Sequence, residues 1–202
     1  MSSRKPSSLQ VGFDVFERHA EYQLAQLERL LRASKALDEA GLLYGIVGGQ
    51  AVAAHVSTVD PDAVRSTRDV DMLIRRDDLS QIKLALASAG FHYRHVAGLD
   101  MFLDGPHGKP SSGIHLVFAG ERVRAENKTA APNITETLQS QSGFKVITLD
   151  ALVRMKLTSY RLKDQVHLQD LIGVGLIDGS WPALYPSPLR ERLQAVIDNP
   201  DG

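Results

Sequence analysis

Two short stretches of the chain decide the fold, and they read Ile46-Val47-Gly48-Gly49 and Arg65-Ser66-Thr67-Arg68-Asp69-Val70-Asp71. The first ends an apolar run and precedes an alanine-rich segment, so it predicts a buried strand over 42–47, a tight turn and a helix over 50–55. The second leads into an apolar run that predicts a strand over 70–74. Glycines between a strand and a helix let backbone N–H groups approach a phosphate, whose charge the helix N-terminus favours.

Asp69 and Asp71 stand one residue apart at the start of the predicted strand. Because side chains along a strand alternate between its two faces, both carboxylates point to the same side, about 7 Å apart along the backbone. Such a pair can converge on one or two hard cations such as Mg²⁺, whereas two uncompensated negative charges repel each other. Solvation is an alternative, as is pairing with one of the nearby arginines Arg65, Arg68, Arg75 and Arg76.

The glycine turn and the acidic pair together match the division of labour in phosphoryl or nucleotidyl transfer. In that chemistry, backbone groups and cations hold the triphosphate while carboxylates hold the metal. We therefore expect Gly48 and Gly49 to seat phosphates. We expect Asp69 and Asp71 to hold Mg²⁺.

The pattern Gly-Gly, a short helix and then Arg-x-Thr-x-Asp-x-Asp resembles the signature of the nucleotidyltransferase superfamily with the DNA polymerase β-like fold. Within it, the pattern is similar to the bacterial minimal nucleotidyltransferases, which include abortive-infection and toxin–antitoxin enzymes and aminoglycoside or lincosamide adenylyltransferases. The resemblance covers residues 46–74, with a long spacing from Gly49 to Asp69 that we attribute to an insertion in the loop 57–64. It implies an enzyme that uses Mg²⁺ to transfer NMP from an NTP to a hydroxyl on a small molecule, a protein or an RNA.

A second stretch, residues 152–171, resembles the helical region that follows the catalytic core in that group. The resemblance implies that Lys156 and Lys163 contact the triphosphate, with Lys163 and Asp164 as a pair that faces the nucleotide. It also implies that Arg65 and Thr67 orient the loop or the phosphates. At helical spacing one polar stripe is formed by Lys156, Tyr160, Lys163, His167 and Asp170. Without the resemblance, that stripe is better explained as the solvated face of a helix.

The chain departs from the family pattern at the third carboxylate, because the apolar strand predicted over 114–118 carries His115 there. Imidazole suits zinc, copper or nickel better than Mg²⁺, but its pKa near neutrality suits a general base. Three interpretations stay open: His115 is a catalytic base, a nearby acid replaces the carboxylate, or the protein binds nucleotide with impaired catalysis. A buried core histidine is a fourth. The acids in question are Asp100, Asp104 and Glu121.

Other interpretations also remain. A catalytically impaired domain would serve as a nucleotide- or partner-binding protein of the toxin–antitoxin type. A dinucleotide-binding oxidoreductase is a weaker alternative, because Gly48 and Gly49 are adjacent and position 51 is alanine, so the fingerprint Gly-x-Gly-x-x-Gly is not met. A histidine metal cluster is another alternative, and it would comprise His92, His95, His107 and His115. A basic patch either touches the acceptor or is simply solvated, and it comprises Arg122, Arg124 and Lys128.

Composition narrows the functional classes. The 202 residues include no cysteine, which excludes disulfide frameworks, thiolate zinc sites and cysteine nucleophiles. Lys and Arg total 23 and Asp and Glu total 24, for a net charge of −1, so the chain is no indiscriminate nucleic-acid binder. No apolar run approaches ~18 residues and no signal-peptide core follows the first residues, so we expect a cytoplasmic protein with no membrane span. The sequence does not predict an oligomeric state.

Strands interleaved with helices predict an α+β (α/β layer) fold with a mixed sheet flanked by helices. We expect a nucleotidyltransferase-like core with an N-terminal helix over 13–145, followed by a C-terminal helical region over 146–202. The expected helices are 13–40, 50–55, 79–89, two segments within 148–172, and 189–197. The expected strands are 42–47, 70–74, 91–96, 99–103 and 114–118.

Overall fold

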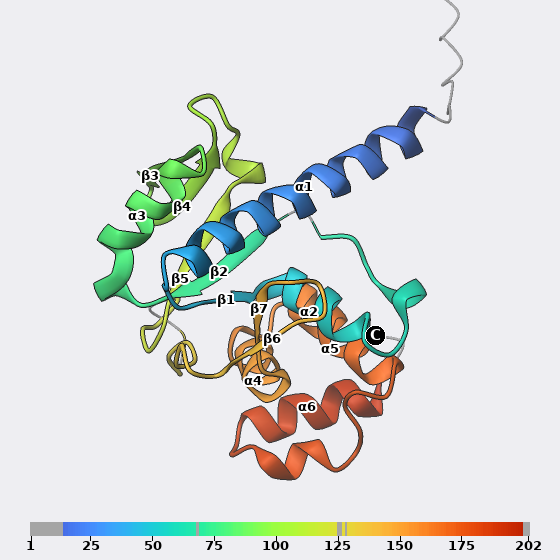
Figure 1. Cartoon of the computed structure of the whole chain (residues 1–202). Coiled ribbons are helices and arrows are strands. Elements are labelled where there is room, and N and C mark those ends of the chain that lie inside the picture. The colour runs from blue at the N-terminus through green and yellow to red at the C-terminus, as the bar shows by residue number, and fades with distance from the viewer. Residues whose placement is uncertain (1–13, 68, 125–126, 128, 200–202) are drawn as a thin grey trace, which may run out of the picture.

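The computed structural model describes residues 14–67, 69–124, 127 and 129–199 (Figure 1). Within this part of the chain, seven strands form one mixed sheet in the order β3-β4-β5-β2-β1-β7-β6. The strands are β1 (Tyr44–Val47), β2 (Val70–Ile74), β3 (Phe91–Val96), β4 (Leu99–Asp104), β5 (Ile114–Phe118), β6 (Thr137–Gln139) and β7 (Lys145–Ile147). The helices are α1 (Asp14–Glu39), α2 (Gly48–Val56), α3 (Leu79–Ser88), α4 (Leu149–Ser159), α5 (Leu162–Gly173) and α6 (Leu189–Asp198).

Strand register brings the sequence-predicted site residues to one face of the sheet. β1 and β2 are antiparallel, with Val47 opposite Asp71, whereas β2 and β5 are parallel, with Asp71 opposite His115. β4 runs antiparallel to β5, with Met101 opposite His115. Because partners in register share a face, Asp71, His115 and Met101 point the same way.

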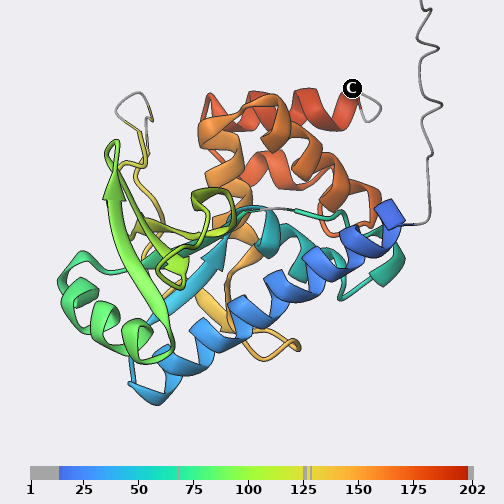
Figure 2. The same ribbon diagram turned by 90° about the horizontal axis from the view of Figure 1, so that it is seen from above.

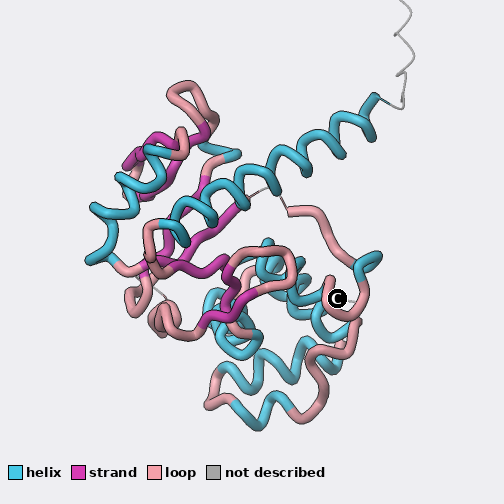
Figure 3. Tube along the Cα trace, viewed as in Figure 1, coloured by secondary structure: helices cyan, strands magenta, loops and turns pink. Residues whose placement is uncertain are grey.

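Helices cover both faces of the sheet. On one face, the Tyr44 hydroxyl donates to Asp38 of α1, and Lys83 of α3 lies 3.5 Å from the centre of the Tyr93 ring. Figure 2 shows α1 on one side of the sheet and the C-terminal helices α4, α5 and α6 on the other. Beyond β7 the described chain consists of helices and loops (Figure 3).

The central strand β2 explains why the acidic pair is unusual. Val70, Met72, Leu73 and Ile74 are all fully buried, as expected for a strand covered on both faces. Asp71 stands alone among them as a half-buried carboxylate. A charge in such an apolar strand is costly unless it is compensated, so its surroundings indicate what it binds.

The predicted fold class, an α+β sheet flanked by helices, is confirmed. The strands predicted over 70–74 and 114–118 match β2 and β5 residue for residue, and the helix predicted over 13–40 matches α1. The helix predicted over 50–55 begins two residues earlier, because Gly48 and Gly49 form its first turn.

The structure contains two short strands that the sequence pattern does not predict. Residues 121–145, to which the sequence analysis assigns no strand, contain β6 and the start of β7, which pairs in parallel with β1. Asp78 directly precedes α3 at its N-cap position, but its carboxylate binds Arg75 and makes no capping hydrogen bond to the helix backbone. The predicted boundary between residues 145 and 146 falls inside β7, and the division at that point stays a prediction. None of the helices in the described part of the chain has the length and apolar character needed to cross a bilayer.

Candidate active site

The double-glycine turn lies directly against the acidic strand. Gly48 has φ +71°, and a Cβ built there would lie 2.2 Å from Asp71 Oδ2. A Cβ on Gly49 would lie 2.5 Å from Thr67 Oγ1. Both distances are shorter than a side chain tolerates, so only glycine fits this close approach. The turn and the acidic pair therefore belong to one site.

Asp69 and Asp71 are half-exposed, and their nearest basic neighbours are a lysine and a histidine instead of the expected arginines. Lys163 Nζ lies 3.5 Å from Asp69 Oδ2, and His115 Nδ1 lies 3.8 Å from Asp71 Oδ1. Three of the nearby arginines form ion pairs with other acids: Arg65 with Asp170, Arg75 with Asp78 and Arg76 with Glu121. The alternative in which these arginines pair with Asp69 or Asp71 was therefore wrong. The fourth, Arg68, lies outside the described residues.

His115 is not a buried core histidine, because 30% of its side chain is exposed. Its Nε2 lies 3.2 Å from the Pro110 carbonyl oxygen, which can only accept a hydrogen bond. When only Nε2 carries a proton, the lone pair of Nδ1 faces the Asp71 carboxylate and the two repel each other. Protonation of Nδ1 replaces this repulsion with attraction. Accordingly, the contact with Asp71 raises the pKa of His115.

The acids that sequence reasoning offered as replacements for the third carboxylate are bound elsewhere, so that interpretation was wrong. Asp100 precedes Met101 on β4 and therefore faces away from His115, where it binds Tyr93 and His95. The other two, Asp104 and Glu121, pair with Arg29 and Arg32 and with Arg76. Across the described part of the chain, no group of three or more His, Asp or Glu residues could hold a metal ion, which also removes the proposed histidine cluster.

A cavity of about 270 Å³ lies between the sheet and the C-terminal helices. Its polar lining comes from both sides, with Gly48, Gly49 and Asp71 from the sheet side and Lys156, Arg161 and Lys163 from the helices. Leu99, Val123 and Met155 contribute an apolar wall. With Asp164 and Arg124, which also line it, the cavity joins a glycine turn, two carboxylates, four cationic side chains and an apolar surface.

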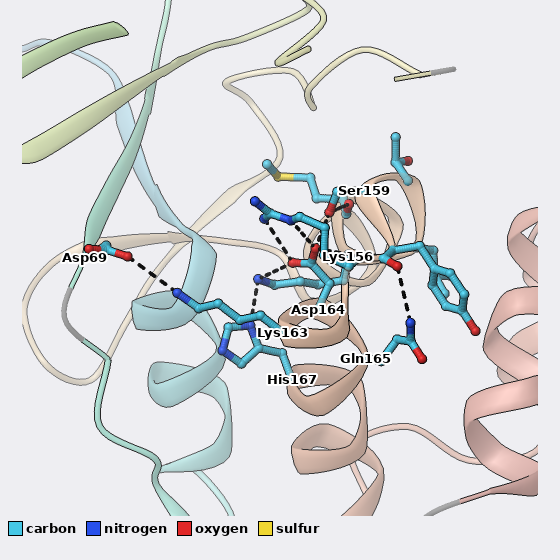
Figure 4. Close-up of polar contacts among 12 residues, drawn as sticks. Asp69, Lys156, Ser159, Lys163, Asp164, Gln165 and His167 are labelled. Carbon is cyan, nitrogen blue, oxygen red and sulfur yellow. Dashed lines mark hydrogen bonds and ion pairs between the residues drawn. The ribbon is translucent and has the colours of Figure 1, made fainter. Parts of the chain in front are cut away.

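The helix side of this cavity is built around Asp164, whose side chain is 1% exposed (Figure 4). Its carboxylate accepts hydrogen bonds from Ser159 Oγ (2.6 Å), Arg161 Nε (2.8 Å) and Lys156 Nζ (3.2 Å). Burial alone would raise the pKa of Asp164. The hydrogen bond from Arg161, the charge of Lys156 and the hydrogen bond from Ser159 outweigh burial and bring the pKa to about 2.

Lys156 and His167 complete the helix side. Lys156 Nζ lies 2.8 Å from His167 Nδ1, and both residues are buried. Burial, followed by the positive charges of Lys156 and Lys163, lowers the pKa of His167 to about 4. Figure 4 shows Lys156 between Asp164 and His167, while Lys163 of α5 reaches across to Asp69.

The predicted polar stripe is not the solvated face of one helix. α4 ends at Ser159, and Tyr160 adopts a left-handed conformation (φ +46°) before α5 begins. Lys156 and His167 point inward, whereas 55% of the Lys163 side chain is exposed. Sequence reasoning placed His167 in the stripe but assigned it no role, because its contact with Lys156 crosses the break between two helices.

Arg65 and Thr67 lie on the loop that leads to the acidic pair. Arg65 Nε donates to Asp170 Oδ1 (2.6 Å), which fastens this loop to α5. Thr67 Oγ1 is buried against the glycine turn and has no hydrogen-bond partner among the described groups. A buried hydroxyl without a partner beside a backbone turn is a favourable contact point for a ligand oxygen.

The remaining predicted groups are less closely connected. Of the basic patch, Arg124 lines the cavity, Arg122 is exposed and Lys128 lies outside the described residues. The dinucleotide alternative does not fit the topology. A dinucleotide-binding unit connects parallel strands through its glycine-turn helix, whereas β1 and β2 are antiparallel.

No family model and no curated protein sequence matches the chain. Among solved structures, the fold is similar to the solution structure of the antibiotic-resistance factor ANT(2'')-Ia. The identity is 11%, 87% of this chain and 91% of that chain are covered, and the TM-score is 0.53. At this identity the likeness shows the fold alone.

Two further solved structures match less well. A crystal structure of ANT(2'')-Ia with adenylyl-2''-tobramycin is 13% identical, over 87% of this chain and 97% of that chain, with a TM-score of 0.45. A nucleotidyltransferase-like protein from Paracoccidioides brasiliensis is 18% identical, over 87% of each chain, with a TM-score of 0.46. At these TM-scores neither likeness carries an argument.

Proposed function

We propose that this protein transfers a nucleoside monophosphate from an NTP to a hydroxyl on a small molecule, a protein or an RNA, with Mg²⁺ as cofactor. The observation that carries the proposal is the single cavity bordered by the Gly48–Gly49 turn, Asp71, Lys156 and Lys163. The fold shared with the antibiotic-resistance factor ANT(2'')-Ia supports it.

Asp69 and Asp71 are the proposed magnesium ligands, and their chemistry fits the ion. Their carboxylates supply the oxygen donors that Mg²⁺ prefers, and Arg65, Arg75 and Arg76 form ion pairs with other acids. Within the described residues, the cluster lacks a third acid, so triphosphate oxygens and water would complete the coordination. When bound, Mg²⁺ would neutralise phosphate charge and orient the reacting groups.

The protein's own groups would position the nucleotide. Backbone N–H groups of the glycine turn and the unpartnered Thr67 hydroxyl offer donors to phosphate oxygens. Lys156 and Lys163 would balance the triphosphate charge from the opposite wall. The apolar wall is suited to the flat surface of a nucleobase.

In the proposed reaction, the acceptor oxygen forms a bond to the α-phosphorus. The bond from that phosphorus to the oxygen bridging to the β-phosphate breaks, and pyrophosphate leaves with the bonding electrons. The hydroxyl proton leaves to a base. His115 is the proposed base because it is the titratable group beside Asp71 on the reacting face of the sheet.

A second function is favoured by one specific observation, the histidine at the place of a third carboxylate. A site with two metal-binding acids would retain nucleotide affinity while losing turnover. The protein would then act as a nucleotide-dependent partner-binding module of the toxin–antitoxin type.

The two functions are separated by measuring NTP binding and NMP transfer on the same preparation. Calorimetry with each of the four NTPs, with and without Mg²⁺, tests binding. NTPs labelled at the α-phosphate, incubated with aminoglycosides, total RNA or protein extract, test transfer. Asp71→Asn is the test variant, and Asp77→Asn, an exposed acid outside the cavity, is its matched control.

Label transfer that requires Asp71 but not Asp77 supports the enzyme. Tight Mg²⁺-dependent NTP binding without transfer to any acceptor favours the binding module. If the wild-type protein binds none of the four NTPs, both functions are wrong.

A further inference from the structure

We propose that Asp164 and His167 are positioning residues that hold the Lys156 ammonium in one orientation, with its remaining N–H bond directed at the triphosphate. This inference rests on the proposed function, because it concerns the same nucleotide. It goes beyond it by assigning roles to two side chains that do not touch the nucleotide.

The first support is the number of donors on Lys156. An ammonium has three N–H bonds and no acceptor. Asp164 Oδ1 at 3.2 Å and His167 Nδ1 at 2.8 Å engage two of them, and these are its partners among the described residues. Lys156 is only 6% exposed and lines the cavity beside Lys163 and Arg161. One donor is therefore left for whatever occupies the cavity.

The second support is that Asp164 is itself fixed. Ser159 Oγ, the Arg161 backbone N–H and Arg161 Nε all donate to Oδ2, while Lys156 approaches Oδ1. The carboxylate therefore joins the end of α4 to the start of α5 and cannot rotate without losing several bonds. A fixed acceptor determines where the lysine nitrogen lies, which a flexible surface partner would not do.

The third support is the state of His167. Since the lysine ammonium only donates, Nδ1 must accept, and the imidazole proton must be on Nε2. The charged groups that act on His167 are Lys156, Lys163, Arg161 and Asp164, and three of these four are cations. Burial and these cations keep the ring neutral near pH 7, so it remains an acceptor for Lys156.

The charge held this way lies within electrostatic reach of the acidic pair. Burial has the largest effect on Lys156 and lowers its pKa, while the negative charges of Asp164 and Asp71 act to raise it. A lysine fixed in advance loses less rotational freedom when the nucleotide binds, which increases affinity. It also places its charge beside the phosphates without reorganisation.

The test is a double-mutant cycle on ATP and AMP affinity, measured by calorimetry with Mg²⁺. We expect Lys156→Met to weaken ATP binding about 30-fold and AMP binding about 2-fold or less, because AMP lacks the β- and γ-phosphates. His167→Leu should weaken ATP binding about 5- to 10-fold and leave AMP binding unchanged. In the Lys156→Met background, His167→Leu should add less than about 2-fold, since there is no ammonium left to position.

Conservative replacement distinguishes positioning from packing. His167→Asn carries an amide oxygen close to the place of Nδ1 and should recover most of the ATP affinity that His167→Leu loses. Gln169→Leu, on the same helix but bonded to the Asn199 carbonyl oxygen, is the matched control and should bind ATP as the wild type does. Thermal unfolding of each variant verifies that it is folded.

A second measurement needs neither nucleotide nor a substitution at His167. ¹⁵N histidine spectra of the wild type near pH 7 should show His167 with its proton on Nε2. A proton on Nδ1 would overturn the inference, as would a loss from His167→Leu that is equally large in the Lys156→Met background. ATP binding by His167→Leu equal to that of the wild type would overturn this inference alone, whereas a wild type that binds no NTP would overturn the proposed function with it.

Discussion

The sheet side of the cavity and the helix side differ in how far the protein satisfies its own polar groups. On the sheet side, 40% of the Asp69 side chain and 32% of the Asp71 side chain are exposed, and their basic neighbours Lys163 and His115 are 3.5 and 3.8 Å away. On the helix side, Asp164 is 1% exposed and accepts several short hydrogen bonds. The first arrangement suits an exchangeable cation, and the second suits a permanent positive charge.

The largest effect should come from substituting one acid on each side. Asp71→Asn is expected to reduce NMP transfer about 10³-fold or more, because it removes a proposed metal ligand. The same substitution should leave the free energy of unfolding unchanged or slightly higher, since it relieves repulsion with Asp69. Asp164→Asn should instead cost about 3 kcal/mol of stability, because it leaves Lys156 buried without its counter-charge.

Label transfer and urea unfolding measure these two outcomes. The comparison between the two sides fails if Asp71→Asn destabilises the protein as much as Asp164→Asn does. It also fails if Asp164→Asn unfolds at the wild-type urea concentration.

The close approach of the glycine turn to Asp71 should give the next largest effect. Gly48→Ala is expected to destabilise the protein by about 3 kcal/mol and to abolish NTP binding, because the new Cβ meets both a left-handed φ and the carboxylate. Gly41→Ala is the matched control, since Gly41 has φ +66° and nothing within 4 Å of its Cβ position. It should show only the backbone cost of about 1 kcal/mol. If urea unfolding shows the same loss of stability for Gly48→Ala and Gly41→Ala, the close approach of Gly48 to Asp71 does not contribute to the free energy of unfolding.

The sheet side was more predictable from sequence than the helix side, for a physical reason. The runs 70–74 and 114–118 are apolar and bounded by polar residues, so local pattern alone defines β2 and β5. The glycine turn is also local, because a strand, two glycines and a helix follow each other directly. The register that places His115 beside Asp71 joins distant segments, and only the family resemblance pointed to it.

The helix side depends on contacts that no local pattern encodes. The sequence predicted two helices within 148–172, and α4 and α5 confirm this. It did not predict the left-handed conformation of Tyr160 between them, nor the convergence of Ser159, Arg161 and Lys156 on Asp164. β6 and β7 were missed for a similar reason, since each has only three residues. The parallel pairing of β7 with β1 is likewise a long-range contact.

Acid titration of stability should reveal the buried histidine of the helix side. Because the folded-state pKa of His167 is about 4 and its ordinary value is 6.5, the unfolded chain binds more protons between these values. Its contribution is therefore fully present above pH 6.5 and is lost as the pH falls toward 4, by about 2 kcal/mol after allowance for solvent screening. Asp164, with a pKa of about 2, loses its contribution only below this window.

Urea unfolding at several pH values checks this slope. Burial also lowers the pKa of His55, so the difference between the wild type and His167→Asn isolates the effect of His167. An identical slope in both proteins would mean that His167 is not held neutral by its surroundings.

The smallest effect should distinguish the two lysines by salt. Lys163 is half-exposed and pairs with Asp69, whereas Lys156 is buried. Lys163→Met should change the free energy of unfolding by less than about 0.5 kcal/mol and weaken ATP binding about 3- to 10-fold at low salt. This loss should shrink as salt rises from about 0.05 to 0.5 M, because exposed charges are screened, while the loss from Lys156→Met should persist. Lys35→Met, which removes an exposed lysine on α1, is the control and should bind ATP normally. A charge in the protein interior is shielded from the salt ions that weaken a surface ion pair. If the losses of ATP affinity in the two variants depend equally on salt, the burial of Lys156 does not distinguish its role from that of Lys163.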